Sequence, residues 1–262
     1  MENLMTEIKA LGPETAWVGR EIVYFEETDS TNRRARLLAQ EGAQHGTLVL
    51  ADRQTAGRGR RGRGWISPAG EGIFMSLLLR PDVHPSQVAK LSLLTALAVA
   101  NAIAEETGLD ARIKWPNDIV INGRKVCGLL LEMDATTEKV ESVVAGVGIN
   151  VHQTVFDEEI AHTASSLDLL AERYVSRSAI VRAFLMEFEQ ATALADNAMI
   201  DAYRERSATI GQKVQVIGLD GTYTGAARGI TESGILLVED EAGRMHEVLA
   251  ADVSVRGIMG YV

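Results

Sequence analysis

A segment rich in arginine and glycine is the most distinctive feature of this sequence. Residues 57–65 read GRGRRGRGW, so four guanidinium groups and four glycines precede Trp65. Arginine offers a planar, permanently charged fork of donors that fits carboxylate and phosphate groups, and glycine lets the backbone come close to a ligand. The segment, here called the arginine loop, predicts an anion-binding site. Taken alone it is compatible with ATP, RNA or an acidic protein.

The charge balance of the whole chain favours a small anion. The sequence has 26 Lys and Arg residues against 36 Asp and Glu residues, a formal net charge of -10. A duplex-binding surface normally produces a basic domain or stripe. An RNA-binding module would also need stacking aromatic side chains beside the basic loop, and only Trp65 is close to it in the sequence. We therefore expect a small anionic ligand and no DNA partner.

A second dense segment, residues 114–118, reads KWPND and is followed by a hairpin that carries Lys125. The lysines can place positive charge on phosphate, and the amide with the carboxylate can offer oxygen ligands to Mg²⁺. Singly, each residue has an ordinary explanation, because Pro116 sets a rigid turn, Trp115 packs in a core and Asp118 caps a turn. The combination is what indicates phosphate chemistry.

Hydrophobic patterns predict a mixed sheet with helices over residues 1–208. Strands are expected at residues 22–25, 47–51, 73–79, 111–114, 119–121, from about 125, and at 140–151, with helices after Ser30, from residue 86 and in much of 177–207. Ser30 offers N-cap chemistry, and Asn122-Gly123 is a strong hairpin signal. Gly146 and Gly148 interrupt a β-branched strand where a ligand can approach the backbone.

From residue 209 onward the pattern changes to short strands separated by turns that contain glycine. The strands are expected at residues 213–217, 222–228, 235–239, 245–249 and 253–256, a spacing that predicts a small barrel. We therefore predict an α+β fold with a main domain at residues 1–208 and a small β-barrel at residues 209–262.

Composition indicates a soluble, cytoplasmic protein without a membrane partner. The longest apolar stretch, residues 91–104, is too short to span a bilayer and is interrupted by polar residues. Cys127 is the only cysteine, so an intramolecular disulfide is impossible, which suits a reducing compartment.

Together these motifs resemble those of biotin–protein ligases. In chain order they are Ser30-Thr31-Asn32, Gln54, the arginine loop with Trp65, KWPND, Lys125-x-x-Gly128 and Gly146-x-Gly148-x-Asn150. The resemblance runs from about Ile22 to the C-terminus. It implies a mixed-sheet catalytic domain of the biotin/lipoate ligase type followed by an SH3-like barrel. It also implies that the protein activates biotin with ATP to biotinyl-5′-AMP and transfers biotin to one lysine of the biotin carrier domain of a biotin-dependent carboxylase.

The resemblance implies a role for each motif residue. Lys125, Arg58 and Arg60 are expected to be catalytic, and Asn117 with Asp118 to lie beside Mg²⁺. Biotin is expected to contact Ser30, Thr31, Asn32, Gln54, Gly57, Arg58, Gly59, Arg60, Lys125, Gly128, Gly146 and Gly148. ATP, a substrate, is expected to contact Arg60, Arg61, Arg63, Trp65, Lys114, Asn117 and Asn150.

Two other classes of enzyme are alternatives to this interpretation, and the sequence differs from the family pattern in one respect. A P-loop ATPase has the glycine spacing of residues 57–62, but Arg63-Gly64 replaces the lysine and hydroxyl of that motif. A lipoate or octanoate ligase or transferase of related fold is the alternative, with Cys127 as the only candidate for a cysteine nucleophile. Only some twenty residues precede the first predicted strand, too few for the winged helix-turn-helix repressor module of many bacterial relatives. The sequence does not decide the oligomeric state, and a homodimer is one possibility.

Overall fold

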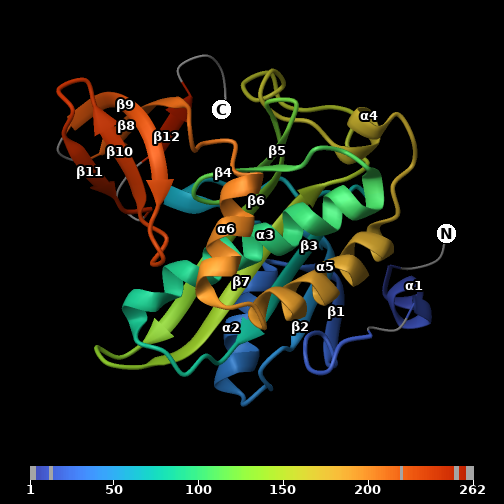
Figure 1. Cartoon of the computed structure of the whole chain (residues 1–262). Helices are drawn as coiled ribbons and strands as arrows, with labels where there is room; N and C mark the ends of the chain where they lie inside the picture. The colour runs from blue at the N-terminus through green and yellow to red at the C-terminus, as the bar shows by residue number, and fades with distance from the viewer. Residues whose placement is uncertain (1–3, 12–13, 219–220, 251–253, 258–262) are drawn as a thin grey trace.

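Two β-sheets of different size organise the chain, whose computed structural model describes residues 4–11, 14–218, 221–250 and 254–257 (Figure 1). The larger sheet has seven strands in the order β1-β2-β3-β7-β6-β5-β4, and the smaller has five in the order β11-β10-β9-β8-β12. β1 and β2 are parallel, whereas the other neighbouring pairs of the larger sheet are antiparallel. The predicted mixed sheet and α+β class are confirmed.

The strands of the larger sheet lie where the hydrophobic runs predict them. They are β1 (Ile22–Thr28), β2 (Leu48–Gln54), β3 (Gly72–Leu79), β4 (Arg112–Lys114), β5 (Asp118–Ile121), β6 (Arg124–Ala135) and β7 (Val140–Asn150). Between β5 and β6 the backbone is left-handed at Asn122 (φ 50°) and Gly123 (φ 73°). This is the two-residue hairpin geometry that the Asn-Gly pair favours, so the predicted hairpin is confirmed.

Helices cover both faces of the larger sheet. They are α1 (Leu4–Leu11), α2 (Thr31–Gln40), α3 (Val88–Thr107), α4 (Leu167–Ala171), α5 (Arg177–Thr192) and α6 (Asp196–Arg206), with 3₁₀ turns η1 (Arg60–Gly62) and η2 (Pro85–Gln87). The sequence patterns missed α1 and α4, which have only 8 and 5 residues. Elements this short carry too few periodic positions to be distinguished from loops.

The alternation of side chains along the strands separates two hydrophobic layers. Leu48 and Leu50 of β2 belong to a large core with α1, α3 and α5, whereas Val49 packs in a smaller cluster with Ala35 and Ala39 of α2. Successive strand residues point to opposite faces, so α2 lies on the face opposite α3 and α5. The motif residues that converge below lie on this α2 face.

Helix α3 is longer than the apolar stretch predicted from the sequence. Within the described residues, the helical segment Pro85–Thr107 is long and apolar enough to cross a membrane, and its most apolar window of 18 residues has a mean hydropathy of 1.5. However, 56% of its most apolar window is buried inside the fold, where α3 packs against α5. The length and composition are those of a helix in the core of this domain.

The smaller sheet confirms the predicted β-rich C-terminal region. Its strands are β8 (Lys213–Gly218), β9 (Gly221–Ile230), β10 (Leu236–Asp240), β11 (Met245–Val248) and β12 (Ser254–Gly257), all paired antiparallel. Residue 253, the expected start of the last strand, lies outside the described residues. Trp115 joins the two parts, because its backbone N–H donates to Thr209 Oγ1 (2.9 Å) and its indole Nε1 donates to the Gly234 carbonyl (3.1 Å).

Candidate active site

Three neighbouring strands, β3, β7 and β6, present little side-chain bulk on the α2 face of the larger sheet. The surface formed there by Gly128, Gly146 and Gly148 is here called the glycine floor. Gly148 of β7 lies opposite Gly128 of β6, and Gly146 lies opposite Ser76 of β3. Residues in register across neighbouring strands share a face. The sheet thereby creates space at the point where the start of α2, the arginine loop and Lys125 come together.

The glycines of this floor make room for side chains of the protein itself. A Cβ atom on Gly146 would lie 2.0 Å from Asn32 Oδ1, and one on Gly148 would lie 2.5 Å from Trp65 Nε1. A Cβ on Gly128 would lie 2.9 Å from Trp65 Cζ3. The sequence predicted close approach at Gly146 and Gly148, and the structure shows that Asn32 and Trp65 are the groups that approach.

Gln54 supplies the acceptor for the first turn of α2, a role that the sequence had assigned to Ser30. Ser30 occupies the N-cap position, but its side chain makes no capping hydrogen bond. Instead, the Thr31 backbone N–H donates to Gln54 Oε1 at the end of β2 (2.8 Å), and Thr31 Oγ1 donates to the same atom (3.1 Å). The N-cap position predicted for Ser30 is confirmed, but the acceptor comes from Gln54, 23 residues from Thr31 in the sequence.

Asn32 is held in one orientation by three partners on two strands, β6 and β3. Its Nδ2 atom donates to the Leu130 carbonyl (3.1 Å) and to Glu132 Oε2 (2.9 Å), while Oδ1 lies 2.7 Å from the Ser76 hydroxyl, which donates to it. Both amide protons are thus used, so Asn32 can offer a ligand only the remaining acceptor capacity of Oδ1. Asn32 is 4% exposed, and water therefore competes little for these bonds.

The arginine loop folds back on itself as a small hairpin. Arg58 and Gly64 form a β-bridge, the Gly59 N–H donates to the Arg63 carbonyl (2.8 Å) and the Trp65 N–H donates to the Gly57 carbonyl (2.9 Å). The backbone is left-handed at Arg61 and Gly62, with φ 56° and 71°. This turn leaves the side chains of Arg61 and Arg63 exposed to solvent.

The other two arginines of the loop are engaged by polar groups of the protein. Arg58 forms an ion pair with Glu132 (3.1 Å). Arg60 donates to Asn117 Oδ1 (3.1 Å) and to the carbonyl of Ala250, which belongs to the C-terminal part of the chain. Burial, with help from the neighbouring Arg61 charge, lowers the pKa of Arg60. A cation desolvated in this way gains from an incoming anion.

Lys125 lies at the centre of the assembly. Its Nζ atom is 2.6 Å from Asp118 Oδ1 and 5.3 Å from the centroid of the Trp65 ring, within the range of a cation–π contact. The lysine backbone is also fixed, since its N–H donates to the Thr163 carbonyl (2.7 Å) and its carbonyl accepts from Ser165 (2.9 Å). Contacts of both its side chain and its backbone therefore hold the positive charge of Lys125 over the glycine floor.

Asn117 and Asp118, the pair expected beside Mg²⁺, are occupied by other partners. Asn117 Oδ1 accepts from Arg60, its Nδ2 donates to the Leu129 carbonyl (2.8 Å), and Asp118 pairs with Lys125. Among the described residues no cluster of three or more His, Cys, Asp or Glu side chains could hold a metal ion. In this arrangement the oxygens of the two side chains hold Arg60 and Lys125. These two residues therefore do not form a metal site from protein ligands alone.

The remaining predicted residues lie at different distances from this centre. Lys114 is buried and lies opposite Asp118 in the β4–β5 register. Asn150 is buried and donates to the Ser165 carbonyl (3.1 Å), a bond that fixes the segment next to Lys125. Cys127 is fully buried, and burial raises the pKa of its thiol well above the usual range. A buried thiol of this kind does not act as a nucleophile.

Three residues of the site were missed from the sequence. Ser76 contacts Asn32 and Thr31 (2.8 Å), Ser67 accepts from Gln54 Nε2 (2.9 Å), and Glu132 joins Asn32 to Arg58. Ser76 carried a signal, because it is the only polar residue in the run from Ile73 to Leu79. Nothing in the local sequence marks Glu132 or Ser67.

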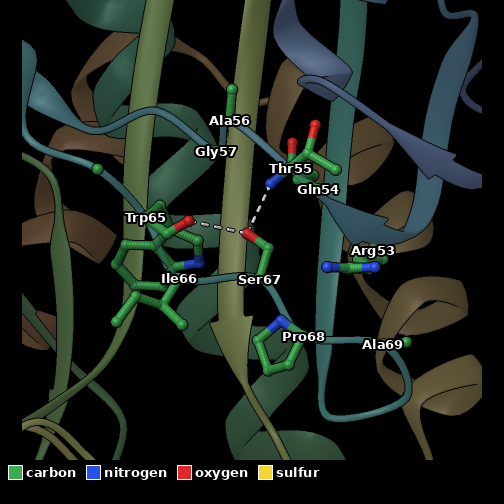
Figure 2. Close-up of a pocket in the computed structure, with 11 residues that line it drawn as sticks. Arg53, Gln54, Thr55, Ala56, Gly57, Trp65, Ile66, Ser67, Pro68 and Ala69 are labelled. Carbon is green, nitrogen blue, oxygen red and sulfur yellow. Dashed lines mark hydrogen bonds between the residues drawn. The ribbon is translucent and has the colours of Figure 1, made fainter.

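A pocket opens beside the loop and extends the site. Its volume is about 750 Å³, and it is lined by residues 53–57 and 64–69. Figure 2 shows Ser67 between Gln54 and Trp65, with hydrogen bonds to the Gln54 side chain and to the Trp65 carbonyl (3.0 Å). This size lies in the range of pockets that take a cofactor-sized ligand.

Comparisons with known proteins agree with this geometry. Residues 24–150 match the Biotin/lipoate A/B protein ligase family, and residues 209–256 match the Biotin protein ligase C terminal domain. The bifunctional ligase/repressor BirA of Bacillus subtilis is 38% identical over 248 residues, which are 92% of this chain and 76% of that protein. The biotin–[acetyl-CoA-carboxylase] ligase of Mycobacterium tuberculosis is 37% identical over 256 residues, 93% of this chain and 91% of that protein.

The solved structures lead to the same family. The biotin protein ligase from Aquifex aeolicus in complex with biotin and ATP superposes with a TM-score of 0.78 at 30% sequence identity, and the match covers 91% of this chain and 99% of that one. Fold, C-terminal domain and sequence identity over most of the length therefore agree. The chain belongs to the biotin protein ligase family.

Proposed function

We propose that this protein activates biotin with ATP and attaches it to a lysine of a carrier domain. The biotin carboxylate attacks the α-phosphorus of ATP and pyrophosphate leaves, which gives biotinyl-5′-AMP. The amine of the carrier lysine then attacks the biotinyl carbonyl, and AMP leaves. The observation that carries this proposal is the convergence of Lys125, Arg58 and Arg60 on a glycine floor bordered by Asn32 and Gln54.

The polar groups match the ureido ring of biotin. Asn32 Oδ1 retains acceptor capacity for a ring N–H, as shown by its three other contacts. Gln54 Oε1 is satisfied by Thr31, and one Nε2 proton is used by Ser67, which leaves the second Nε2 proton for the ring carbonyl. We propose that Ser30, Thr31, Asn32 and Gln54 select the ring, with Trp65 and the glycines against its apolar part.

The cations suit the adenylation step. Two anions, a carboxylate and a phosphate, must approach each other, and negative charge then increases on the oxygens around the α-phosphorus. Fixed cations in a site sheltered from water stabilise such charge most effectively. We propose that Lys125 and Arg60 act on the phosphate, that Arg58 acts on the biotin carboxylate or its adenylate, and that the exposed Arg61 and Arg63 meet the outer phosphates of ATP.

Magnesium enters this scheme with the nucleotide. Mg²⁺ is commonly bound through substrate phosphates and only one or two protein carboxylates, and Asn117 and Asp118 already hold Arg60 and Lys125. We propose that the metal, when bound, would screen phosphate charge, and that Asp118 is the protein carboxylate that could hold it. Adenylation should require Mg²⁺, whereas binding of biotin without ATP should not.

Biotin is favoured over lipoate by the polar pattern. The dithiolane ring of lipoate has no hydrogen-bonding group to satisfy Asn32 and Gln54, and an unpaired buried polar group is costly. The Mycobacterium tuberculosis relative and the Aquifex aeolicus structure reported above both carry biotin in their names. We further propose that the domain boundary lies at about residue 208, that the protein works in the cytoplasm, and that it binds no DNA sequence-specifically, in keeping with its net charge of -10.

One assay tests the proposed function. The purified protein is incubated with ATP, Mg²⁺ and either biotin, lipoate or octanoate, and the acyl adenylates are detected by mass spectrometry, with and without a biotin carrier domain. We expect biotinyl-5′-AMP in both cases and a biotinylated carrier in the second. Efficient activation of lipoate or octanoate with none of biotin would refute the proposal.

A further inference from the structure

Glu132 is a carboxylate in an apolar position of the larger sheet. It lies on β6 opposite Val144 of β7, which in turn lies opposite Leu78 of β3. The glutamate side chain is 16% exposed. Burial of a charge among apolar neighbours is unfavourable unless the charge is paired and hydrogen-bonded, so the role of Glu132 is defined by the groups that pair with it.

The two carboxylate oxygens of Glu132 hold two different parts of the site. Oε2 accepts from Asn32 Nδ2 at 2.9 Å, and Oε1 pairs with Arg58 Nη1 at 3.1 Å. Asn32 belongs to the start of α2, and Arg58 belongs to the arginine loop. Glu132 thus contacts both the ureido-binding set, through Asn32, and a cation of the arginine loop, Arg58.

We propose that Glu132 is a positioning residue that links the biotin site to the arginine loop. Through Oε2 it fixes the Asn32 amide so that Oδ1, and not Nδ2, faces the substrate. Through Oε1 it holds Arg58 and with it the N-terminal arm of the loop, in the absence of ligand. The inference rests on the proposed function for its biotin half, whereas the Arg58 half concerns the free protein alone.

Glutamine at this position separates the two roles. The amide oxygen of a glutamine can still accept from Asn32 Nδ2, but its NH₂ group faces the Arg58 guanidinium donor to donor. Glu132→Gln therefore keeps the Asn32 contact and loses the Arg58 contact, whereas Glu132→Met loses both while keeping a side chain of similar length. Asp134→Asn is the matched control, because Asp134 lies two residues further along β6 and pairs with Arg36 of α2.

The first measurement is tryptic cleavage after Arg61 and Arg63 in the free full-length protein, followed by mass spectrometry. Glu132→Gln should cleave at least threefold faster than the parent protein, and Asp134→Asn at the parent rate. In an Arg58→Ala background, Glu132→Gln should add no further increase. Parent-like cleavage of Glu132→Gln, or the same increase with and without Arg58, would overturn the link to the loop.

The second measurement is the kinetics of adenylation with biotin as the varied substrate. Glu132→Met should raise the KM for biotin about tenfold, a change equivalent to about 1.4 kcal/mol. The KM for ATP should stay unchanged and Glu132→Gln should give a smaller rise. An equal effect on both substrates, or none on biotin, would overturn the Asn32 half. If the parent protein forms no biotinyl adenylate, the proposed function fails, and the cleavage comparison still decides the loop half.

Discussion

Gly146→Ala is expected to damage biotin binding by displacing Asn32. The added Cβ would lie 2.0 Å from Asn32 Oδ1 and within 3 Å of Asn32 Cγ and Nδ2. A carbon and an oxygen in contact need about 3.3 Å, so the amide has to move by more than about 1 Å. Asn32 cannot keep its hydrogen bonds through such a shift, because its partners are fixed in the strands β3 and β6.

The magnitude follows from the bonds that this shift breaks. Asn32 accepts from Ser76 at 2.7 Å and donates to Glu132 at 2.9 Å. A net contribution of about 1 kcal/mol for the neutral bond and about 1.5–3 kcal/mol for the charged one gives a total of roughly 3 kcal/mol. Since this loss is shared between folding and binding, we expect the KM for biotin to rise roughly 10–100-fold and the free energy of unfolding to fall by about 1–3 kcal/mol.

The assay combines adenylation kinetics with urea unfolding of the same preparations. Gly229→Ala in β9 is the matched control, because a Cβ at that strand glycine would meet no atom within 4 Å. The control should leave both the KM for biotin and the unfolding midpoint close to those of the parent protein. A folded Gly146→Ala protein with the parent KM for biotin would refute the assignment of Asn32 to the biotin site.

Three further perturbations test other parts of the site and fold. Lys125→Ala should slow adenylation roughly 10²–10³-fold, as loss of one preorganised hydrogen-bond donor does in other active sites, and a folded variant with near-parent rates would exclude Lys125 from the chemistry. Arg60→Gly loses the contacts to Asn117 and Ala250 and should release biotinyl-5′-AMP faster, so that bystander proteins are labelled more; unchanged bystander labelling would contradict this. Burial lowers the pKa of His45, whose Nδ1 accepts from the Arg80 N–H, so the unfolded state binds its proton first. The free energy of unfolding that depends on this group is therefore present above about pH 6.5 and is lost as the pH falls further. An equally steep fall in the free energy of unfolding of His45→Gln, measured in urea, would show that another group is responsible.

Local signals in the sequence predicted local structure well. Asn122-Gly123 specifies its turn through the backbone preferences of two residues, and the structure has that turn. The hydrophobic runs likewise placed the strands of both sheets, because burial on one or two faces imposes the pattern directly. The motif residues could be recognised as a set, since the arginine loop and the KWPND segment are unusual in composition.

Contacts between distant segments were harder to predict. Ser30 has the residue type of a helix cap, yet Gln54 supplies the acceptor, since the sheet brings β2 to the start of α2. Gly146 and Gly148 were expected to admit a ligand, but the register across β3, β7 and β6 places Asn32 and Trp65 against them. Such pairings depend on topology and register, which no local pattern encodes.

Three cations of this site each have an oxygen partner before any substrate arrives. Arg58 has Glu132, Arg60 has Asn117 and a carbonyl of the C-terminal part, and Lys125 has Asp118. Unpaired charges in a sheltered site would be costly, so these partners allow the cations to be held ready. An incoming anion must then exchange with them, which lowers affinity for phosphate or carboxylate alone. A substrate that also satisfies the amides beside the glycine floor offsets that cost, and selectivity for a particular acid follows from this exchange.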